Sequence, residues 1–439
     1  MIRLLLAFMA LVSSVSPAAA ETIPQRIAAD MPGLIAIYRD LHANPELSFQ
    51  EVRSAKVMAD AARKAGFAVT EKVGRTGVVA VLRNGAGPTV LIRADMDGLP
   101  VTEQTGLPFA STRRGVSTAG VESGVMHACG HDTHMTAWIE TARLLAARKG
   151  EWSGTLVMIA QPGEEMGLGA RAMLADGLFT RFPKPDYALA FHDATELPAG
   201  VVGAKPGWAL ANVDSVDIEV KGVGGHGAYP HMAKDPIVLA SAIVMRLQTL
   251  VSREQNPIEP AVVTVGSFHG GTKHNIISDG ARLELTVRSF SDQNRRQLLD
   301  GIRRIAVGEA AAAGMPQDRM PVVTVKEPYT RATFNTPDFT REIAADLSAR
   351  MGAERVVVLD QPVMGGEDFD EYRRADEAHI KSAILWVGGT APAALEAARQ
   401  GGKPIPSLHS PFWVPDAEKV IASGAEALSS TALRLMGKR

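Results

Sequence analysis

Between residues 67 and 191, short apolar, β-branched segments alternate with helical segments, and this alternation restricts the fold more than any other feature of the chain. Strands are expected at 67–73, 77–82, 89–93, 155–160 and 187–191, and helices at 26–42, 50–65, 132–148 and 168–175. Nearly continuous apolar strands separated by helices are typical of a mixed or parallel sheet with helices on both faces. The expected fold class is therefore α/β, with a mixed-sheet catalytic domain.

A different pattern occupies residues 210–325. The strand expected at 214–221 alternates polar and apolar residues, as a strand with one exposed face does. A helix at 236–252 follows, with Asp235 as its N-cap. Strands at 261–268 and 282–289, a helix at 292–313 and a strand at 322–326 complete the order β-α-β-β-α-β. This is the split ferredoxin-like order, and it predicts an inserted lid or dimerisation domain.

The catalytic domain is expected to comprise residues 21–209 and 326–439, because 439 residues exceed one ordinary domain. Its second part contains a predicted helix at 337–351, with Thr336 as its cap. Strands are expected at 355–359 and 384–387, and a closing helix at 416–436. Residues 388–407 are rich in Gly, Pro and Ala and are expected to form a loop.

Residues 1–20 have the pattern of a secretory signal peptide. Arg3 precedes nine apolar residues, and small residues at Ala18 and Ala20 suit cleavage before Glu21. A membrane anchor is the alternative, but nine apolar residues rise only about 14 Å as a helix, well short of a bilayer core. No later stretch reaches eighteen apolar residues. We therefore expect an exported protein, periplasmic or secreted, with no membrane segment after cleavage.

Composition excludes several classes of protein. The chain is 46% apolar and 21% charged, as globular proteins are, which excludes a disordered or collagen-like chain. Its 46 Lys and Arg residues against 48 Asp and Glu residues leave a net charge of −2, so charge provides no case for binding nucleic acid. One cysteine, Cys129, excludes an internal disulfide. That thiol is therefore inert, reactive or a metal ligand.

Residues that can bind a divalent metal come directly after predicted strands. Three strands are followed by Asp95 and Asp97, by Glu164 and Glu165, and by His192. The segment MHACGHD (126–132), which contains Cys129 and His131, precedes a predicted helix. Open α/β sheets bind ligands at the carboxyl ends of their strands. We therefore expect thiolate, imidazole and carboxylate groups to meet at one edge, where they suit zinc or a similar ion.

A single cysteine is most often a buried, inert thiol. His131, two residues after Cys129, makes metal binding the better hypothesis, because both side chains can reach one ion from one turn. Of the paired Glu164 and Glu165, one carboxylate can bind metal while the other stays free as a base. For His127 and His134 we favour supporting or solvated positions.

Ten motifs carry a family resemblance. They are RDLHANPELSFQE (39–51), IRADMDGLP (92–100), MHACGHD (126–132), QPGEEMGLGA (161–170), FHD (191–193), GVGGHGAYPHMAKDP (222–236), HNIISD (274–279), TVRSF (286–290), GGEDF (365–369) and LHSPFW (408–413). In these motifs and their order the chain resembles the metal-dependent aminoacylase/carboxypeptidase family of metallopeptidases. The similar branch contains hippurate hydrolases and plant indole-3-acetyl-amino-acid amidohydrolases.

The resemblance implies a catalytic domain with two divalent metal ions and a ferredoxin-like lid. Zinc is the first choice of metal, and manganese, cobalt or nickel are the alternatives. The residues matching the family's metal ligands are Cys129, His131, Glu165, His192 and His409. We expect Cys129, His131 and His192 to hold one ion, and Cys129, Glu165 and His409 the other, with the thiolate bridging. Glu164 matches the family's general base. Asp97 matches a carboxylate that lies behind the family's metal ligands. His226, Asn275 and Arg288 match lid residues that reach the substrate, His226 across a dimer interface.

The expected reaction is hydrolysis of the amide bond of N-acyl or N-aroyl amino acids by a metal-activated water. Arg288 suits the free carboxylate of such a substrate, because its planar guanidinium binds carboxylates bidentately. A dipeptidase or carboxypeptidase of the same family, an endopeptidase and a non-catalytic metal- or peptide-binding protein are the alternatives. The chain departs from the family pattern at Ser278, at Asp193 and at 108–124, an insertion that is longer than the family's usual link. The insertion and Asp193 are expected to border the substrate pocket, which leaves the preferred acyl group open.

Overall fold

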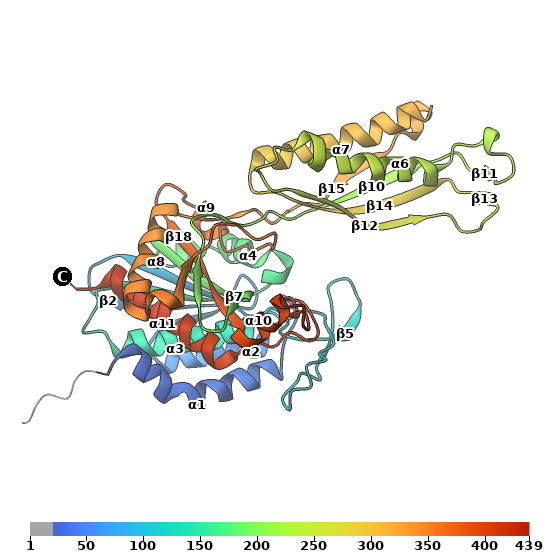
Figure 1. Cartoon of the computed structure of the whole chain (residues 1–439). Helices are drawn as coiled ribbons and strands as arrows, with labels where there is room; N and C mark the ends of the chain where they lie inside the picture. The colour runs from blue at the N-terminus through green and yellow to red at the C-terminus, as the bar shows by residue number, and fades with distance from the viewer. Residues whose placement is uncertain (1–20, 439) are drawn as a thin grey trace, which may run out of the picture.

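The computed structural model describes residues 21–438, so the signal peptide predicted at 1–20 lies outside the described residues. Eight strands form one large mixed sheet (Figure 1). Their order across the sheet is β1 (Ala68–Val73), β2 (Gly77–Asn84), β6 (Gly154–Gln161), β3 (Thr89–Asp95), β7 (Tyr187–Pro198), β18 (Lys381–Thr390), β8 (Val202–Ala204) and β17 (Val356–Val358).

The four central strands β6, β3, β7 and β18 run parallel to one another. Strands β2 and β8 join this group antiparallel, one on each side. The carboxyl ends of the central strands therefore meet at one edge of the sheet. Glu164 and Glu165 follow β6 as expected, whereas His192 lies within β7, which continues past its predicted end at residue 191. This is the edge at which open α/β sheets bind ligands.

Helices cover both faces of the large sheet. One face packs against α1 (Ile23–His42), α2 (Val52–Lys64), α3 (His131–Ala147), α8 (Pro337–Met351) and α11 (Ala417–Met436). The other packs against α4 (Gly169–Ala175), α5 (Leu178–Arg181) and α9 (Glu371–Arg374). Neighbouring residues of β3 show the alternation, since Ile92 lies in the first core and Leu91 in the second. The predicted mixed sheet with two covered faces is confirmed.

A four-stranded antiparallel sheet forms the inserted lid (Figure 1). Its order is β12 (Val262–Gly270), β14 (Gly280–Arg288), β10 (Asp214–Lys221) and β15 (Val322–Val325). One face packs against α6 (Pro236–Thr249) and α7 (Asp292–Ala312). The chain order is the predicted β-α-β-β-α-β. A short ribbon of β11 (Gly225–His226) and β13 (Ile276–Ile277) lies at the end of the lid remote from the large sheet (Figure 1).

The pattern of β10 shows why the lid has one covered face. Val216, Ile218 and Val220 are buried, whereas Ser215 and Glu219, at alternate positions of the strand, are exposed. Helix α6 begins as predicted, because the Asp235 carboxylate accepts hydrogen bonds from the N–H groups of Ile237 and Val238. Within residues 21–438, the segment Pro236–Glu254 is the one helix long and apolar enough to cross a membrane, judged by length and composition. Its inner face packs in the lid core.

One local expectation was wrong, and two were right only in part. Residues 388–407 contain the helix α10 (Pro392–Arg399), because Pro392 at its first turn and the following Ala, Leu and Glu residues favour a helix over a loop. Thr336 occupies the N-cap position of α8, but its hydroxyl accepts a hydrogen bond from the Ser382 N–H and does not cap the helix. The α-helix α6 ends at Thr249, where a wider π turn continues to Glu254.

Candidate active site

The five predicted metal ligands come together at the carboxyl edge of the large sheet. Ligand atoms of Cys129, His131 and His192 lie within 4.8 Å of one another. Ligand atoms of Cys129, Glu165 and His409 form a second such group. The two groups share Cys129, and their membership is the division expected from the sequence.

A tight turn at Gly130 places Cys129 and His131. Gly130 has a φ of +81°, and a Cβ atom there would lie 2.3 Å from a carboxylate oxygen of Asp193. The backbone conformation and the close contact both require glycine. His131 is consequently the first residue of α3, and Cys129 lies directly before the helix.

A second turn places Glu164 and Glu165. Gly163, at the end of β6, has a φ of +61° and starts the short 3₁₀ helix Glu164–Met166. Its first two N–H groups, from Glu164 and Glu165, donate hydrogen bonds to the Asp97 carboxylate at 3.1 and 3.0 Å. Asp97 therefore lies behind the ligand groups and orients the turn that carries both glutamates.

Hydrogen bonds to the buried histidines determine which ring nitrogen can bind metal. His131 Nδ1 lies 2.8 Å from the Asp97 carbonyl oxygen, and His192 Nδ1 lies 2.8 Å from the Asp193 carbonyl oxygen. A carbonyl oxygen only accepts, so both Nδ1 atoms carry hydrogen and each neutral ring has its lone pair on Nε2. His192 Nε2 points at Cys129 Sγ, 3.4 Å away. Burial lowers the pKa of His192 to about 3, which keeps this ring neutral.

His409 approaches from the segment between α10 and α11. Its φ is +67°, a conformation that residues other than glycine rarely adopt. Its N–H donates to the Ala128 carbonyl oxygen at 2.8 Å, and its Nε2 lies 3.5 Å from Glu165. The His409 side chain is 54% exposed, so the site opens to solvent on this side. A strained backbone conformation such as the positive φ of His409 is typical of functional positions.

The site gathers acidic groups whose negative forms are disfavoured by burial. Burial, with the charges of Glu165 and Glu164, raises the pKa of the Cys129 thiol well above its usual value. Burial raises the pKa of Glu165 to about 8. Burial and the nearby Glu367 also raise the pKa of Glu164. A divalent cation reverses this tendency and deprotonates a coordinating thiol.

Two buried ligand atoms lack partners in the described part of the chain. His131 Nε2 and Glu165 Oε1 have no hydrogen-bond partner there, although buried polar atoms nearly always have one. Both atoms point into the ligand groups described above. Thiolate, imidazole and carboxylate in this arrangement fit two divalent ions, and zinc, manganese, cobalt or nickel would each accept these ligands.

Sequence reasoning missed a buried acidic pair beside Glu164. Carboxylate oxygens of Glu164, Glu367 and Asp368 lie within 4.8 Å of one another. The fully buried Arg93 offsets their charge, with Nη1 2.6 Å from Asp95 and Nη2 2.7 Å from Glu367. The signals were present, since Glu367 and Asp368 belong to the GGEDF motif and Arg93 is a lone charge in an apolar strand.

The other predicted residues near the site are buried. His134 Nδ1 contacts Asp95 at 2.7 Å, and its Nε2 accepts the Asp193 N–H at 3.1 Å. His127 is buried, and its burial lowers its pKa to about 4. Asp193 is buried against the Gly130 turn, where it accepts a hydrogen bond from Thr133. Asp193 therefore packs against the turn that carries Cys129 and His131.

The three predicted lid residues lie in two places. His226 and Asn275 are exposed and adjacent, in the β11–β13 ribbon at the remote end of the lid (Figure 1). His226 Nδ1 accepts the Ala228 N–H at 3.0 Å, so the neutral ring carries its hydrogen on Nε2, free to donate. Arg288 lies at the other end of the lid. Within one chain, Asn275 and Arg288 therefore lie at opposite ends of the lid and do not meet.

Arg288 lies where the lid meets the catalytic domain. It is half-buried, its Nε donates to Thr286 at 3.1 Å, and its Nη1 donates to the Met364 carbonyl oxygen at 3.4 Å. Burial lowers its pKa, against the opposing charge of Asp214. No carboxylate in residues 21–438 lies within 4 Å of this guanidinium. Met364 is three residues before Glu367, so Arg288 borders the segment that reaches Glu164.

Comparison with protein-family models identifies the family. Residues 91–399 match the model described as peptidase family M20/M25/M40. The chain belongs to this family. The membership confirms the metallopeptidase family predicted from the motifs, and with it an enzyme that hydrolyses amide bonds.

Individual relatives agree with this assignment over most of the chain. The hippurate hydrolase of Campylobacter jejuni is 37% identical over 76% of this chain and 83% of its own length. The IAA-amino acid hydrolase ILR1-like 4 of Arabidopsis thaliana is 32% identical over 92% of this chain and 86% of its own. A Bacillus subtilis crystal structure, described as a dinuclear metal binding peptidase from the M20 family, superposes with a TM-score of 0.73 at 32% identity. It covers 93% of this chain and 100% of its own.

Replacing Cys129 by alanine is expected to remove metal, because both ligand groups depend on this thiol. Elemental analysis of the purified Cys129→Ala variant should show clear loss relative to wild type prepared in parallel. Circular dichroism serves as the control for folding. Retention of two ions by the folded variant would contradict the assignment of Cys129 as the shared ligand.

Proposed function

We propose that this enzyme is a metal-dependent amidohydrolase that cleaves the amide bond of N-acyl or N-aroyl amino acids. The observation that carries the proposal is the pair of ligand groups sharing Cys129, with the carboxylate of Glu164 beside them. Relatives named for hippurate and for IAA-amino acids, which are N-acylated amino acids, support this substrate class. Two divalent ions would be bound, zinc being the first choice.

The roles of the residues follow from their positions. Cys129, His131, His192, Glu165 and His409 would hold the ions, which when bound lower the pKa of a water and polarise the amide carbonyl. Glu164 would take the proton of this water and then pass it to the leaving amine. Both transfers are needed because an amide anion is a poor leaving group. Asp97 would keep Glu164 oriented through the N–H groups it binds.

The substrate carboxylate would be bound by Arg288. This guanidinium is half-buried, lacks a carboxylate partner within residues 21–438, and borders the segment that leads to Glu367. Binding the carboxylate at one end while the amide is held at the other would fix the substrate for attack. A small substrate with a free carboxylate is therefore favoured over a long peptide.

We also propose a homodimer formed through the lid. The edge of β12 is unpaired in the described sheet, and the adjacent α6 exposes Val238 and Met245, at 66% and 72%. A free edge beside an apolar helix face suits pairing with a second copy. In such a dimer the remote end of one lid could reach the partner's site, where the free Nε2–H of His226 would donate toward the developing oxyanion and Asn275 would assist.

Export to the periplasm, or secretion, is a further proposal. It is supported by Arg3, the apolar segment after it, and the small residues Ala18 and Ala20. An exported enzyme of this kind would act on N-acyl amino acids outside the cytoplasm.

Replacing Glu164 by glutamine should keep the metals and lower kcat at least about 100-fold, the smaller effect expected for a lost general base. The substitution keeps the shape of the side chain and removes its ability to take a proton. The measurement is hydrolysis of N-acetyl and N-benzoyl amino acids, with metal content determined on the same samples. Near wild-type turnover at full metal content would place the base elsewhere.

Replacing Arg288 by alanine should lower kcat/KM on N-acyl amino acids roughly 10- to 150-fold, the loss expected for a charged hydrogen-bond partner. The corresponding amino-acid amides lack the negative charge and should be affected much less. Arg282→Ala is the matched control, since Arg282 lies on the same strand but pairs at the surface with Asp217 and Glu284. Equal losses on acids and amides would mean that Arg288 only supports the lid.

Sedimentation should show a dimer, and Met245→Glu on the exposed face of α6 should weaken it. If His226 acts across the interface, His226→Ala and Glu164→Gln are each inactive alone. A mixture of the two that has exchanged subunits should regain activity, because one site of each mixed dimer then has both residues intact. A strict monomer that keeps full activity in His226→Ala would contradict this arrangement.

A further inference from the structure

Residues 46–51 (ELSFQE), here called the strap, contact the loop that carries Asp97 and the turn that carries Glu164 and Glu165. The strap binds the Asp97 loop at three consecutive residues. The Glu46 carbonyl oxygen accepts the Gly98 N–H at 2.7 Å, Leu47 forms a β-bridge with Gly98, and the Ser48 hydroxyl donates to the Asp97 carboxylate at 2.6 Å. These contacts with the strap therefore help to fix the position of Asp97.

The last residue of the strap, Glu51, binds the turn that carries Glu164. Its side chain is fully buried, and its Oε1 accepts the N–H of Gly163 at 2.8 Å. The same oxygen accepts the N–H of Phe49 at 2.7 Å. The second carboxylate oxygen accepts the hydroxyl of Thr76. One buried carboxylate thus joins the strap to the residue directly before Glu164.

Phe49 adopts a backbone conformation that needs such support. Its φ is +63°, which bulky residues rarely adopt unless their surroundings hold them there. Its ring lies against Gly163, where a Cβ atom would come within 2.6 Å of it, and Arg75 covers the ring at 4.3 Å. The hydrogen bond to Glu51 stabilises this conformation and keeps the aromatic ring against the Gly163 turn.

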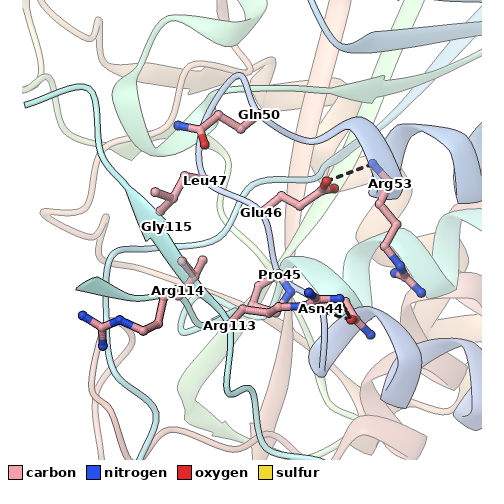
Figure 2. Close-up of a pocket in the computed structure, with 10 residues that line it drawn as sticks. Asn44, Pro45, Glu46, Leu47, Gln50, Arg53, Arg113, Arg114 and Gly115 are labelled. Atoms are coloured by element: carbon pink, nitrogen blue, oxygen red, sulfur yellow. Dashed lines mark hydrogen bonds between the residues drawn. The ribbon is translucent and has the colours of Figure 1, made fainter. Parts of the chain in front are cut away.

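Two side chains of the strap, those of Glu46 and Gln50, anchor it to the rest of the domain (Figure 2). The Glu46 carboxylate accepts the N–H groups of Arg53 and Ser54, in the first turn of α2. Gln50 donates to the Val116 carbonyl oxygen at 3.1 Å, in β4 (Arg114–Val116) of the 108–124 insertion. A pocket of about 280 Å³ separates part of the strap from this insertion. The strap is therefore fixed to α2 and to the insertion behind it.

We propose that Glu51 is a positioning residue, which holds the Gly163 turn so that Glu164 and Glu165 face the site in fixed relation to Asp97. The proposal rests on the function proposed above only for the identity of the base. Glu51 contacts no metal ligand and acts through two accepted N–H hydrogen bonds. Its length and its acceptor oxygen are therefore what matter, and its negative charge is not required.

Two conservative substitutions separate length from charge. Glu51→Gln keeps an oxygen that can accept both N–H groups, and its amide can donate to the Thr76 hydroxyl. Glu51→Asp keeps the charge but withdraws the carboxylate by one methylene group. We expect Glu51→Gln to stay close to wild type. Glu51→Asp should lower kcat by roughly 10- to 100-fold, as a misplacement of about 1 Å at a catalytic group can.

The readouts are kcat on metal-loaded enzyme and amide hydrogen exchange of the turn 163–167. Glu51→Asp should exchange faster at this turn, whereas Glu51→Gln should match wild type. Thr76→Val is the matched control, because it removes a bond to the other oxygen of Glu51 and leaves the Gly163 bond intact. Exchange needs no substrate, so it tests positioning even if the wild-type enzyme fails on N-acyl amino acids, a result that would contradict only the proposed function.

Three results would overturn the proposal. Glu51→Gln could be as impaired as Glu51→Asp, which would assign the effect to charge. Both variants could match wild type in kcat and exchange, which would show that the turn holds its position without Glu51. Glu51→Asp could loosen the turn while keeping wild-type kcat, which would leave Glu51 a structural role alone.

Discussion

Negative charge buried at one sheet edge is the constraint on which the rest of this structure depends. Six carboxyl groups and one thiol gather there, a costly arrangement unless each charge is compensated. The carboxyl groups belong to Asp95, Asp97, Glu164, Glu165, Glu367 and Asp368. Arg93 is the only arginine or lysine that pairs with this group in residues 21–438. One arginine cannot balance so many acids, so the site is built for added cations.

The buried charges of the site are compensated in different ways, and the kind of partner indicates what each residue does. Backbone N–H groups and a serine hydroxyl bind Asp97, which stays behind the ligands and orients them. Buried histidines donate through Nδ1 to carbonyl oxygens and keep Nε2 free. Arg93 pairs with Asp95 and Glu367. The group of Cys129, Glu165 and His409 opens to solvent at His409 and has no arginine or lysine partner within residues 21–438. The protein thus compensates the carboxylates that pair with Arg93, whereas the thiol and the carboxylate of the group that contains His409 are left for metal.

The lid contributes polar groups at two distances from this edge. Arg288 lies at the junction with the catalytic domain, close to the segment leading to Glu367. His226 and Asn275 lie at the opposite end, exposed and adjacent. Within residues 21–438 the lid therefore brings Arg288 to this junction and leaves His226 and Asn275 away from the ligand groups. In the dimer proposed above, the free edge of β12 beside the exposed apolar residues of α6 would pair with a second copy, whose site His226 and Asn275 would then reach.

Much of this could be predicted from the sequence, because local signals were strong. The bounds of β10 and α8 agree with expectation, since alternation and helix periodicity are read from neighbouring residues. The ligand types and their place near strand ends predicted a metal site at this edge, and the family resemblance added His409 and the two groups that share Cys129. What only the tertiary structure decided depends on contacts between distant segments. Glu51 reaches Gly163 across 112 positions, Arg93 reaches Glu367 across 274, and His226 and Arg288 lie at opposite ends of one sheet. No spacing along the chain encodes such contacts, because they exist only once separate strands and turns are packed side by side.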